Sequence, residues 1–99
     1  MATWFISRHQ GAIDWAKQQK IAVDHWETHL DAGKIQSGDI VIGTLPIHLA
    51  AEICQKGARF FFLELNLHAD QRGKELTADE MSQAGCSLAE YDIRSIFQE

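Results

Sequence analysis

A short polar turn near the N-terminus, residues 7–11, carries side chains that suit the binding of a phosphate group. Arg8 offers a permanent cation whose planar guanidinium can donate two hydrogen bonds to one anion. Its neighbour His9 can take up or release a proton near neutral pH, and the hydroxyl of Ser7 can donate a hydrogen bond to an oxyanion. The turn therefore predicts anion binding combined with proton transfer. By residue type alone, however, an Arg-His pair on a turn does not identify a particular function.

A second polar turn, residues 43–48, also follows a hydrophobic run. Thr44 offers a hydroxyl, and His48 stands one turn inside a helix predicted to begin near Pro46. The start of such a helix presents unpaired backbone N–H groups and the positive end of the helix dipole, which suit phosphate oxygens. Two structural alternatives stay open, because Thr44 also suits a helix N-cap and a histidine near a helix start often faces solvent. Neither turn has the spacing of a Walker loop or of a dinucleotide fingerprint.

Two other polar groups invite a functional interpretation. A loop predicted over residues 66–76 contains Arg72 and Lys74, which either complete a phosphate pocket or are solvated loop charges. His25 and His29 flank a glutamate but lack the His-Glu-x-x-His order of a zinc motif. On a strand they would lie roughly 13 Å apart at ~3.3 Å per residue, too far for one ion. We therefore expect no metal site and no cofactor.

Short hydrophobic runs alternate along the chain with helical patterns, which predicts an α/β fold. The predicted strands are residues 3–6, 22–30, 39–43, 59–65 and 87–97, the last with a helical tail as an alternative. The predicted helices are residues 12–19, residues 46–56, and a short helix that opens with a capping box over 77–80 and ends at Gly85. The run at 39–43 is almost continuously apolar, which is typical of a parallel strand buried on both faces.

These elements predict a single domain, residues 1–99, with a small Rossmann-like, mostly parallel sheet flanked by helices. In such sheets, ligands collect beyond the carboxyl ends of the strands. The turns at 7–11 and 43–48 both follow predicted strands. Both turns are therefore expected positions for a bound anionic ligand.

The overall composition limits the classes of partner. The chain has 99 residues, 45% of them hydrophobic, and a formal net charge of −5, which fits one globular domain. The negative charge argues against binding of long nucleic acids but allows a small anionic ligand held by a few local cations. No apolar run approaches the roughly 20 residues of a membrane span, and the first residues lack the pattern of a secretory signal.

Two isolated cysteines, Cys54 and Cys86, are the only ones in the chain. Cys54 falls in a helical pattern, so we expect a buried free thiol there, with a disulfide as the alternative. Free thiols fit a reducing cytoplasm, which is the expected location.

Several segments together resemble a family of small type III CRISPR-associated proteins related in fold to the nucleotide-sensing CARF domains. The resemblance covers about residues 3 to 92. Its segments are 7–16 (SRHQGAIDWA), 38–52 (GDIVIGTLPIHLAAE), 57–60 (GARF), 72–76 (RGKEL) and 79–81 (DEM). The match over segment 38–52 is fairly specific to the family, whereas the Arg-Gly-x-Glu-Leu match alone is weak evidence for it. The resemblance therefore implies a CARF-like variant of the Rossmann-like fold.

The resemblance also implies a function, that of a ring nuclease. Such an enzyme binds cyclic oligoadenylate, here expected to be cyclic tetra-adenylate, across the two-fold axis of a homodimer and cuts it. The matching positions imply catalytic roles for His48, His9 and Thr44. They imply substrate binding by Ser7, Arg8 and Arg72. Gly43 and Leu45 flank Thr44, and Lys74 stands on the same loop as Arg72, so these three are also predicted to bind substrate. The reaction needs no metal, because the ribose 2′-OH is a built-in nucleophile that only has to be aligned and deprotonated.

Within that assignment, His48 or His9 is the general acid or base, Arg8 clamps the phosphate, and the hydroxyls donate to the oxyanion. Two alternatives stay open. A binding module that holds the cyclic nucleotide without cutting it would carry the same turns. A subunit that contacts the effector complex is the third possibility.

Overall fold

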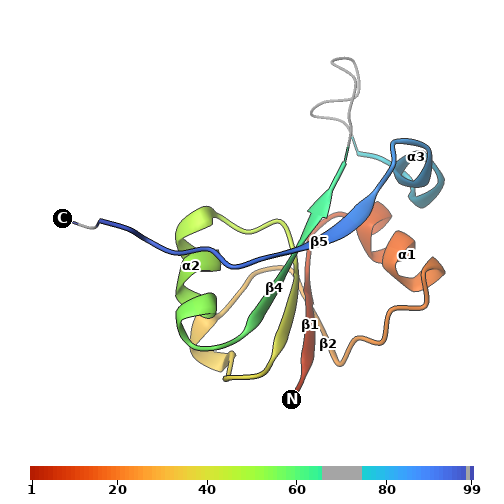
Figure 1. Cartoon of the computed structure of the whole chain (residues 1–99). Coiled ribbons are helices and arrows are strands. Elements are labelled where there is room, and N and C mark those ends of the chain that lie inside the picture. The colour runs from red at the N-terminus through yellow and green to blue at the C-terminus, as the bar shows by residue number, and fades with distance from the viewer. Residues whose placement is uncertain (66–74, 98) are drawn as a thin grey trace.

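The computed structural model describes residues 1–65, 75–97 and 99. In chain order its elements are β1 (Thr3–Ile6), α1 (Gln10–Gln18), β2 (His25–Glu27), the 3-10 helix η1 (Ala32–Lys34), β3 (Ile40–Gly43), α2 (Ile47–Gln55), β4 (Arg59–Glu64), α3 (Ala78–Gln83) and β5 (Ser87–Tyr91). The strands form one sheet in the order β2-β1-β3-β4-β5 (Figure 1). All neighbours pair in parallel except β5, which is antiparallel to β4. The predicted Rossmann-like, mostly parallel sheet is confirmed.

Helices cover both faces of the sheet, because the side chains of a strand alternate between the two faces (Figure 1). In β1, Trp4 and Ile6 face α2 and η1, whereas Phe5 faces α1 and α3. The first core consists of Trp4, Ile6, Ile35, Val41, Ala50, Ile53, Ala58 and Phe60. The second consists of Phe5, Ala12, Trp15, Ala16, Ile42, Leu63, Ala78 and Met81. The sheet therefore sits between two apolar layers, as a strand buried on both faces requires.

Strand β2 is much shorter than the prediction of residues 22–30. Among the strands of the described residues it pairs with β1 alone, which offers partners from Trp4 to Ile6. Before it, the Asp24 carboxylate accepts a hydrogen bond from the backbone N–H of Thr3. After Glu27 the chain leaves the sheet, because the partner strand ends and turns toward α1. The prediction was wrong here because an edge strand reaches only as far as its single neighbour.

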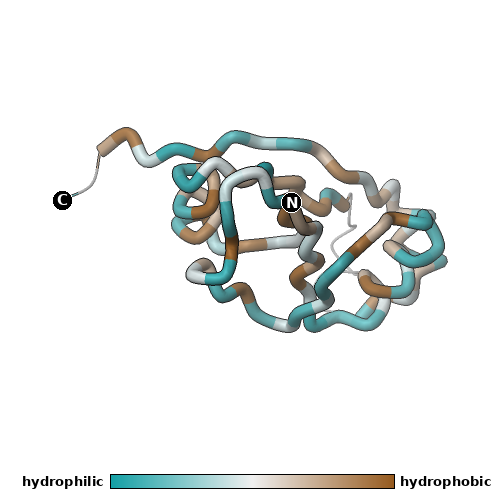
Figure 2. The backbone as a smooth tube through the Cα atoms, turned by 90° about the horizontal axis from the view of Figure 1, so that it is seen from below, coloured by the Kyte–Doolittle hydropathy of each residue, from teal (hydrophilic) through white to brown (hydrophobic). Residues whose placement is uncertain are grey.

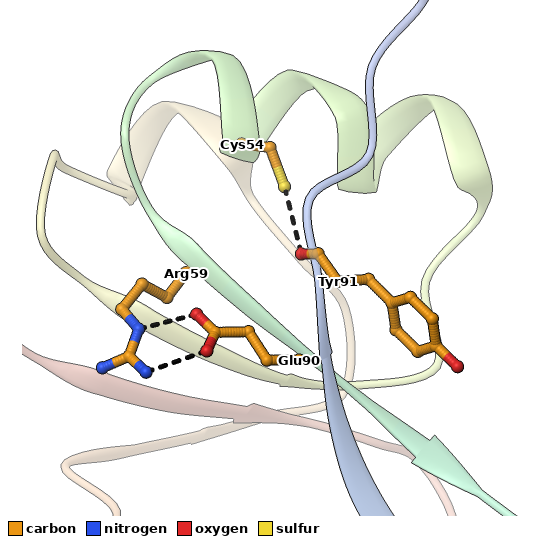
Figure 3. Close-up of polar contacts among 4 residues, drawn as sticks. All are labelled: Cys54, Arg59, Glu90 and Tyr91. Atoms are coloured by element: carbon orange, nitrogen blue, oxygen red, sulfur yellow. Dashed lines mark hydrogen bonds and ion pairs between the residues drawn. The ribbon is translucent and has the colours of Figure 1, made fainter.

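The last strand also ends earlier than predicted. Tyr91 pairs with Phe60, next to the start of β4, and in the described part of the chain no strand lies beyond it for residues 92–97 to join. In Figure 3, Arg59 and Glu90 form a two-pronged ion pair across these strands, with N···O distances of 2.7 and 3.0 Å. Residues 92–97, called the tail here, then run past α2 (Figure 1) and away from the body of the domain (Figure 2).

Both cysteines are free and half-buried. The Cys54 thiol lies 3.9 Å from the backbone oxygen of Tyr91 (Figure 3). The free thiol expected at Cys54 is confirmed, but the residue is half-buried where the prediction was buried. Burial raises the pKa of the Cys86 thiol to about 11, which keeps it protonated and weakly reactive. Among the residues that the structure describes, no helix is long and apolar enough to cross a membrane.

A buried carboxylate fixes the start of the sheet. Asp39 is 5% exposed and accepts hydrogen bonds from the backbone N–H groups of Ala2 and Gln36 and from the indole N–H of Trp4. These donors, the backbone groups above all, hold the pKa of Asp39 below its usual value of 3.8. Through these hydrogen bonds, the Asp39 carboxylate connects the N-terminus, β1 and the turn before β3.

Replacing Asp39 with Asn should lower the free energy of unfolding at neutral pH by about 1–3 kcal/mol. In either orientation of the new amide, its NH₂ group would face at least one of the three N–H donors. Two donors cannot hydrogen-bond to each other, so at least one bond is lost. Because the folded-state pKa is depressed, the stabilisation is present above pH 4 and is lost as the pH falls through the folded value. Urea unfolding between pH 7 and pH 2 measures both effects.

The control for Asp39 is Asp31→Asn, which changes an exposed carboxylate that accepts one backbone bond, from Gly33. Its loss of stability should be smaller. Equal losses of stability in the two variants would contradict a specific role for the buried charge. So would an Asp39→Asn variant that loses as much stability as the parent between pH 7 and pH 2.

Candidate functional site

The carboxyl ends of three parallel strands meet at one edge of the sheet. Ile6 at the end of β1 is in register with Glu27 of β2 and with Gly43 of β3. The chain continues from β1 to β2 on one side and returns to β3 on the other. This is a topological switch point, where the connections leave toward opposite faces and open a crevice for ligands.

A hollow of about 370 Å³ lies at this switch point. It is lined by Ile6, Ser7, Arg8, His9, Thr28, His29, Leu30, Thr44, Leu45, Pro46 and Leu49. Five residues predicted for the site are therefore brought together: Ser7, Arg8, His9, Thr44 and Leu45. Arg8, His9 and Thr44 are exposed, so a ligand from solution can reach them. The structure thus joins the two predicted turns in one place.

His48 lies elsewhere. It is the second residue of α2 and lines a larger cavity, about 1170 Å³, between that helix and the tail. Successive residues of an α-helix point about 100° apart, so neighbours face different surroundings. Leu49 faces the hollow and Ala50 the core, while Ile47 and His48 face the tail. The two histidines of the predicted site, His9 and His48, are therefore not lining one pocket.

Gly43, predicted to bind substrate, has a clear backbone role. Its φ is +151°, and a Cβ placed there would lie 2.4 Å from the backbone oxygen of Ile6. Only glycine allows β3 to pass this close to the end of β1 while turning toward Thr44. Gly43 therefore sets the distance between the two turns.

Both helices that begin near the hollow start without a side-chain cap. The N-cap residues are His9 for α1 and Pro46 for α2, and neither makes a side-chain capping hydrogen bond. The alternative that Thr44 caps α2 is therefore wrong. By contrast, α3 has the predicted capping box, in which Thr77 accepts from the N–H of Glu80. The dipoles of α1 and α2 are thus directed to the region where an anion would bind.

His9 has a partner that the sequence did not indicate. Its Nδ1 lies 2.7 Å from Oε1 of Glu75, which precedes α3. The Oγ of Ser7 accepts a hydrogen bond from the backbone N–H of His9 at 3.1 Å, and its own O–H stays able to donate. The turn at residues 7–11 is therefore fixed by two contacts, one from Ser7 within the turn and one from Glu75 before α3.

Thr28 and His29 were also missed as site residues. They fall inside the predicted strand 22–30, and His29 was considered only as a metal ligand. Once β2 ends at Glu27, the same rule about strand ends places them beside the turn at residues 7–11. A shorter prediction for this edge strand would have found them.

Two predicted substrate-binding residues, Arg72 and Lys74, lie outside the described residues. Within residues 1–65, 75–97 and 99, no three His, Cys, Asp or Glu side chains converge in a way that could hold a metal ion. The hollow itself contains one guanidinium, two imidazoles and three hydroxyl side chains, those of Ser7, Thr28 and Thr44. Such a set can bind a phosphodiester and move a proton on or off an oxygen.

Comparison with known proteins places the chain in a family. The model of a family described as "Putative CRISPR-associated protein (Cas_VVA1548)" matches residues 4–94. The chain belongs to this CRISPR-associated family. The comparisons with curated proteins and with solved structures give no match.

In this CRISPR-associated protein, the matched stretch contains every residue that lines the hollow and both members of the His9–Glu75 pair. It ends within the tail, before Ser95. The hollow therefore lies wholly within the part of the chain that the family model matches.

Proposed function

We propose that this protein is a ring nuclease that cuts cyclic oligoadenylate, with cyclic tetra-adenylate as the expected ligand, and so ends signalling by a type III CRISPR system in the cytoplasm. Membership of a CRISPR-associated family supports the biological setting. The observation that carries the proposal is the hollow at the switch point, because it combines a guanidinium with two histidines and three hydroxyl side chains.

The proposed reaction uses the nucleophile that RNA already contains. Arg8, the helix starts and the hydroxyl groups hold the phosphate in line with the neighbouring 2′-OH. Nε2 of His9 takes the proton of the 2′-OH as its oxygen bonds to phosphorus. The bond from phosphorus to the 5′ oxygen breaks, and His29 returns a proton to that oxygen. The products are a 2′,3′-cyclic phosphate and a 5′-hydroxyl, and no water is consumed.

The size of the hollow supports the proposed homodimer. At about 370 Å³ it lies near the lower end of the roughly 300–1,000 Å³ that drug-sized ligands occupy. A ring of four nucleotides is much larger, so one hollow would hold only part of it. Two copies facing each other across a two-fold axis would supply two hollows and double every cation at the axis.

Purified protein incubated with radiolabelled cyclic tetra-adenylate in EDTA tests the proposal. Linear products on a denaturing gel support the ring nuclease. An unchanged ring with a shifted band on a native gel supports the alternative, a module that holds the nucleotide without cutting it. The absence of both cleavage and binding would contradict both. Light scattering of the same mixture measures whether two copies carry one ring.

A further inference from the structure

Glu75 lies far from the turn at residues 7–11 in sequence but beside it in space. Its Oε1 is 2.7 Å from Nδ1 of His9, and the two side chains are 69% and 52% exposed. Ion pairs this exposed contribute little to folding stability, because water screens them. The contact therefore has more consequence for the orientation of the imidazole than for the fold.

The backbone fixes the approach of these two residues. Gly11 follows His9 by two positions, and Leu76 follows Glu75 directly. A Cβ at Gly11 would lie 1.7 Å from the backbone oxygen of Leu76, so the start of α1 and the segment before α3 are in direct backbone contact. Glycine at position 11 is therefore required by this close backbone contact.

The helices behind this contact are anchored in the core. Ala78 and Met81 of α3 are buried in the same cluster as Ala12 and Trp15 of α1. The capping box of Thr77 begins α3 only two residues after Glu75. The backbone positions of His9 and Glu75 are thus set by packed elements.

We propose that Glu75 is a positioning residue for His9, acting on the ring so that Nε2 faces the ligand. A carboxylate on Nδ1 favours the tautomer that carries its proton on Nδ1, which leaves Nε2 able to accept a proton. When Nε2 takes up that proton, the carboxylate faces an imidazolium and stabilises it. This proposal rests on the proposed function, in which His9 is the base.

Cleavage by the full chain and by Glu75→Ala and Glu75→Gln tests the proposal. Glu75→Ala should lower the single-turnover rate by about 10- to 100-fold, the loss that follows when the group that orients a metal-ligating histidine is removed. Binding of the ring should change little. Glu75→Gln keeps an acceptor oxygen and should retain more activity than Glu75→Ala. Asp79→Asn, which removes an exposed charge from α3, is the control and should cleave like the parent.

A second measurement separates this proposal from the proposed function. Imidazole ¹⁵N spectra of the ligand-free protein should show the proton of neutral His9 on Nδ1 in the parent and its partial transfer to Nε2 in Glu75→Ala. If the parent cleaves nothing, the proposed function fails, while the spectra still decide whether Glu75 orients His9. Parental cleavage in Glu75→Ala, or identical spectra for the two proteins, would overturn the positioning role.

Discussion

Replacing His9 with Ala should lower the turnover of cyclic tetra-adenylate by about 10²–10⁴-fold, the usual contribution of a general acid or base. The ring should still bind, because Arg8 and the hydroxyl groups of the hollow remain. The exposed His9 side chain adds little to the core, so the variant should unfold at nearly the parental temperature. Single-turnover cleavage and a native-gel titration measure the rate and the affinity separately.

His48→Ala is the matched control for His9→Ala, because His48 is also exposed near the start of a helix but lines the cavity beside the tail. It should cleave within a few-fold of the parent. The opposite result, with activity lost in His48→Ala and kept in His9→Ala, would move the chemistry to the outer face of α2. Arg8→Ala should differ from both by weakening binding itself.

Replacing Gly43 with Ala should lower the free energy of unfolding by roughly 2–5 kcal/mol. The φ of +151° disfavours any side chain, and the new Cβ would meet the backbone oxygen of Ile6 at 2.4 Å. For a domain of this size that loss is a large share of the total stability. Ligand binding should fall as well, because relief of the clash moves the two turns apart. Thermal unfolding and the native-gel titration measure the two effects.

Gly38 provides the matched control for Gly43. Its φ is +88°, but a Cβ there would have nothing within 4 Å. Gly38→Ala should therefore cost only the backbone strain, about 1–2 kcal/mol, and leave binding unchanged. Equal losses in the two variants would show that the close approach of β1 and β3 is not the reason for glycine at position 43. If Gly43→Ala kept the parental stability but lost binding, we would infer instead that Gly43 contacts the ligand directly.

The central strands were predictable because burial on both faces leaves a clear pattern. The prediction for β1 coincides with residues 3–6, and that for β3 begins one residue early, at Asp39. Asp39 was included because it adjoins the apolar run, although its buried carboxylate binds the turn before the strand. The edge strands β2 and β5 were predicted too long, since their length depends on a neighbour that the local sequence does not contain.

The candidate site was predictable to the extent that it follows from strand ends. Ser7 and Thr44 follow β1 and β3 directly, so the rule for parallel sheets brings them together. The direction of His48 depends on how α2 is rotated about its axis, which its apolar spacing fixes only coarsely. The contact between His9 and Glu75 joins residues 66 positions apart and rests on the packing of α1 against α3, which no local pattern reports.

The hollow is built from three segments of chain that come together only when β1, β2 and β3 pair. An unfolded chain has no such surface, so a ligand of the hollow binds the native state alone. By thermodynamic linkage, a ligand present at 100 times its dissociation constant would stabilise the native state by about 2.7 kcal/mol. For a domain of this length, each kcal/mol raises the unfolding temperature by about 4–8 °C. Thermal melting can therefore rank candidate cyclic nucleotides by ring size without any measurement of cleavage.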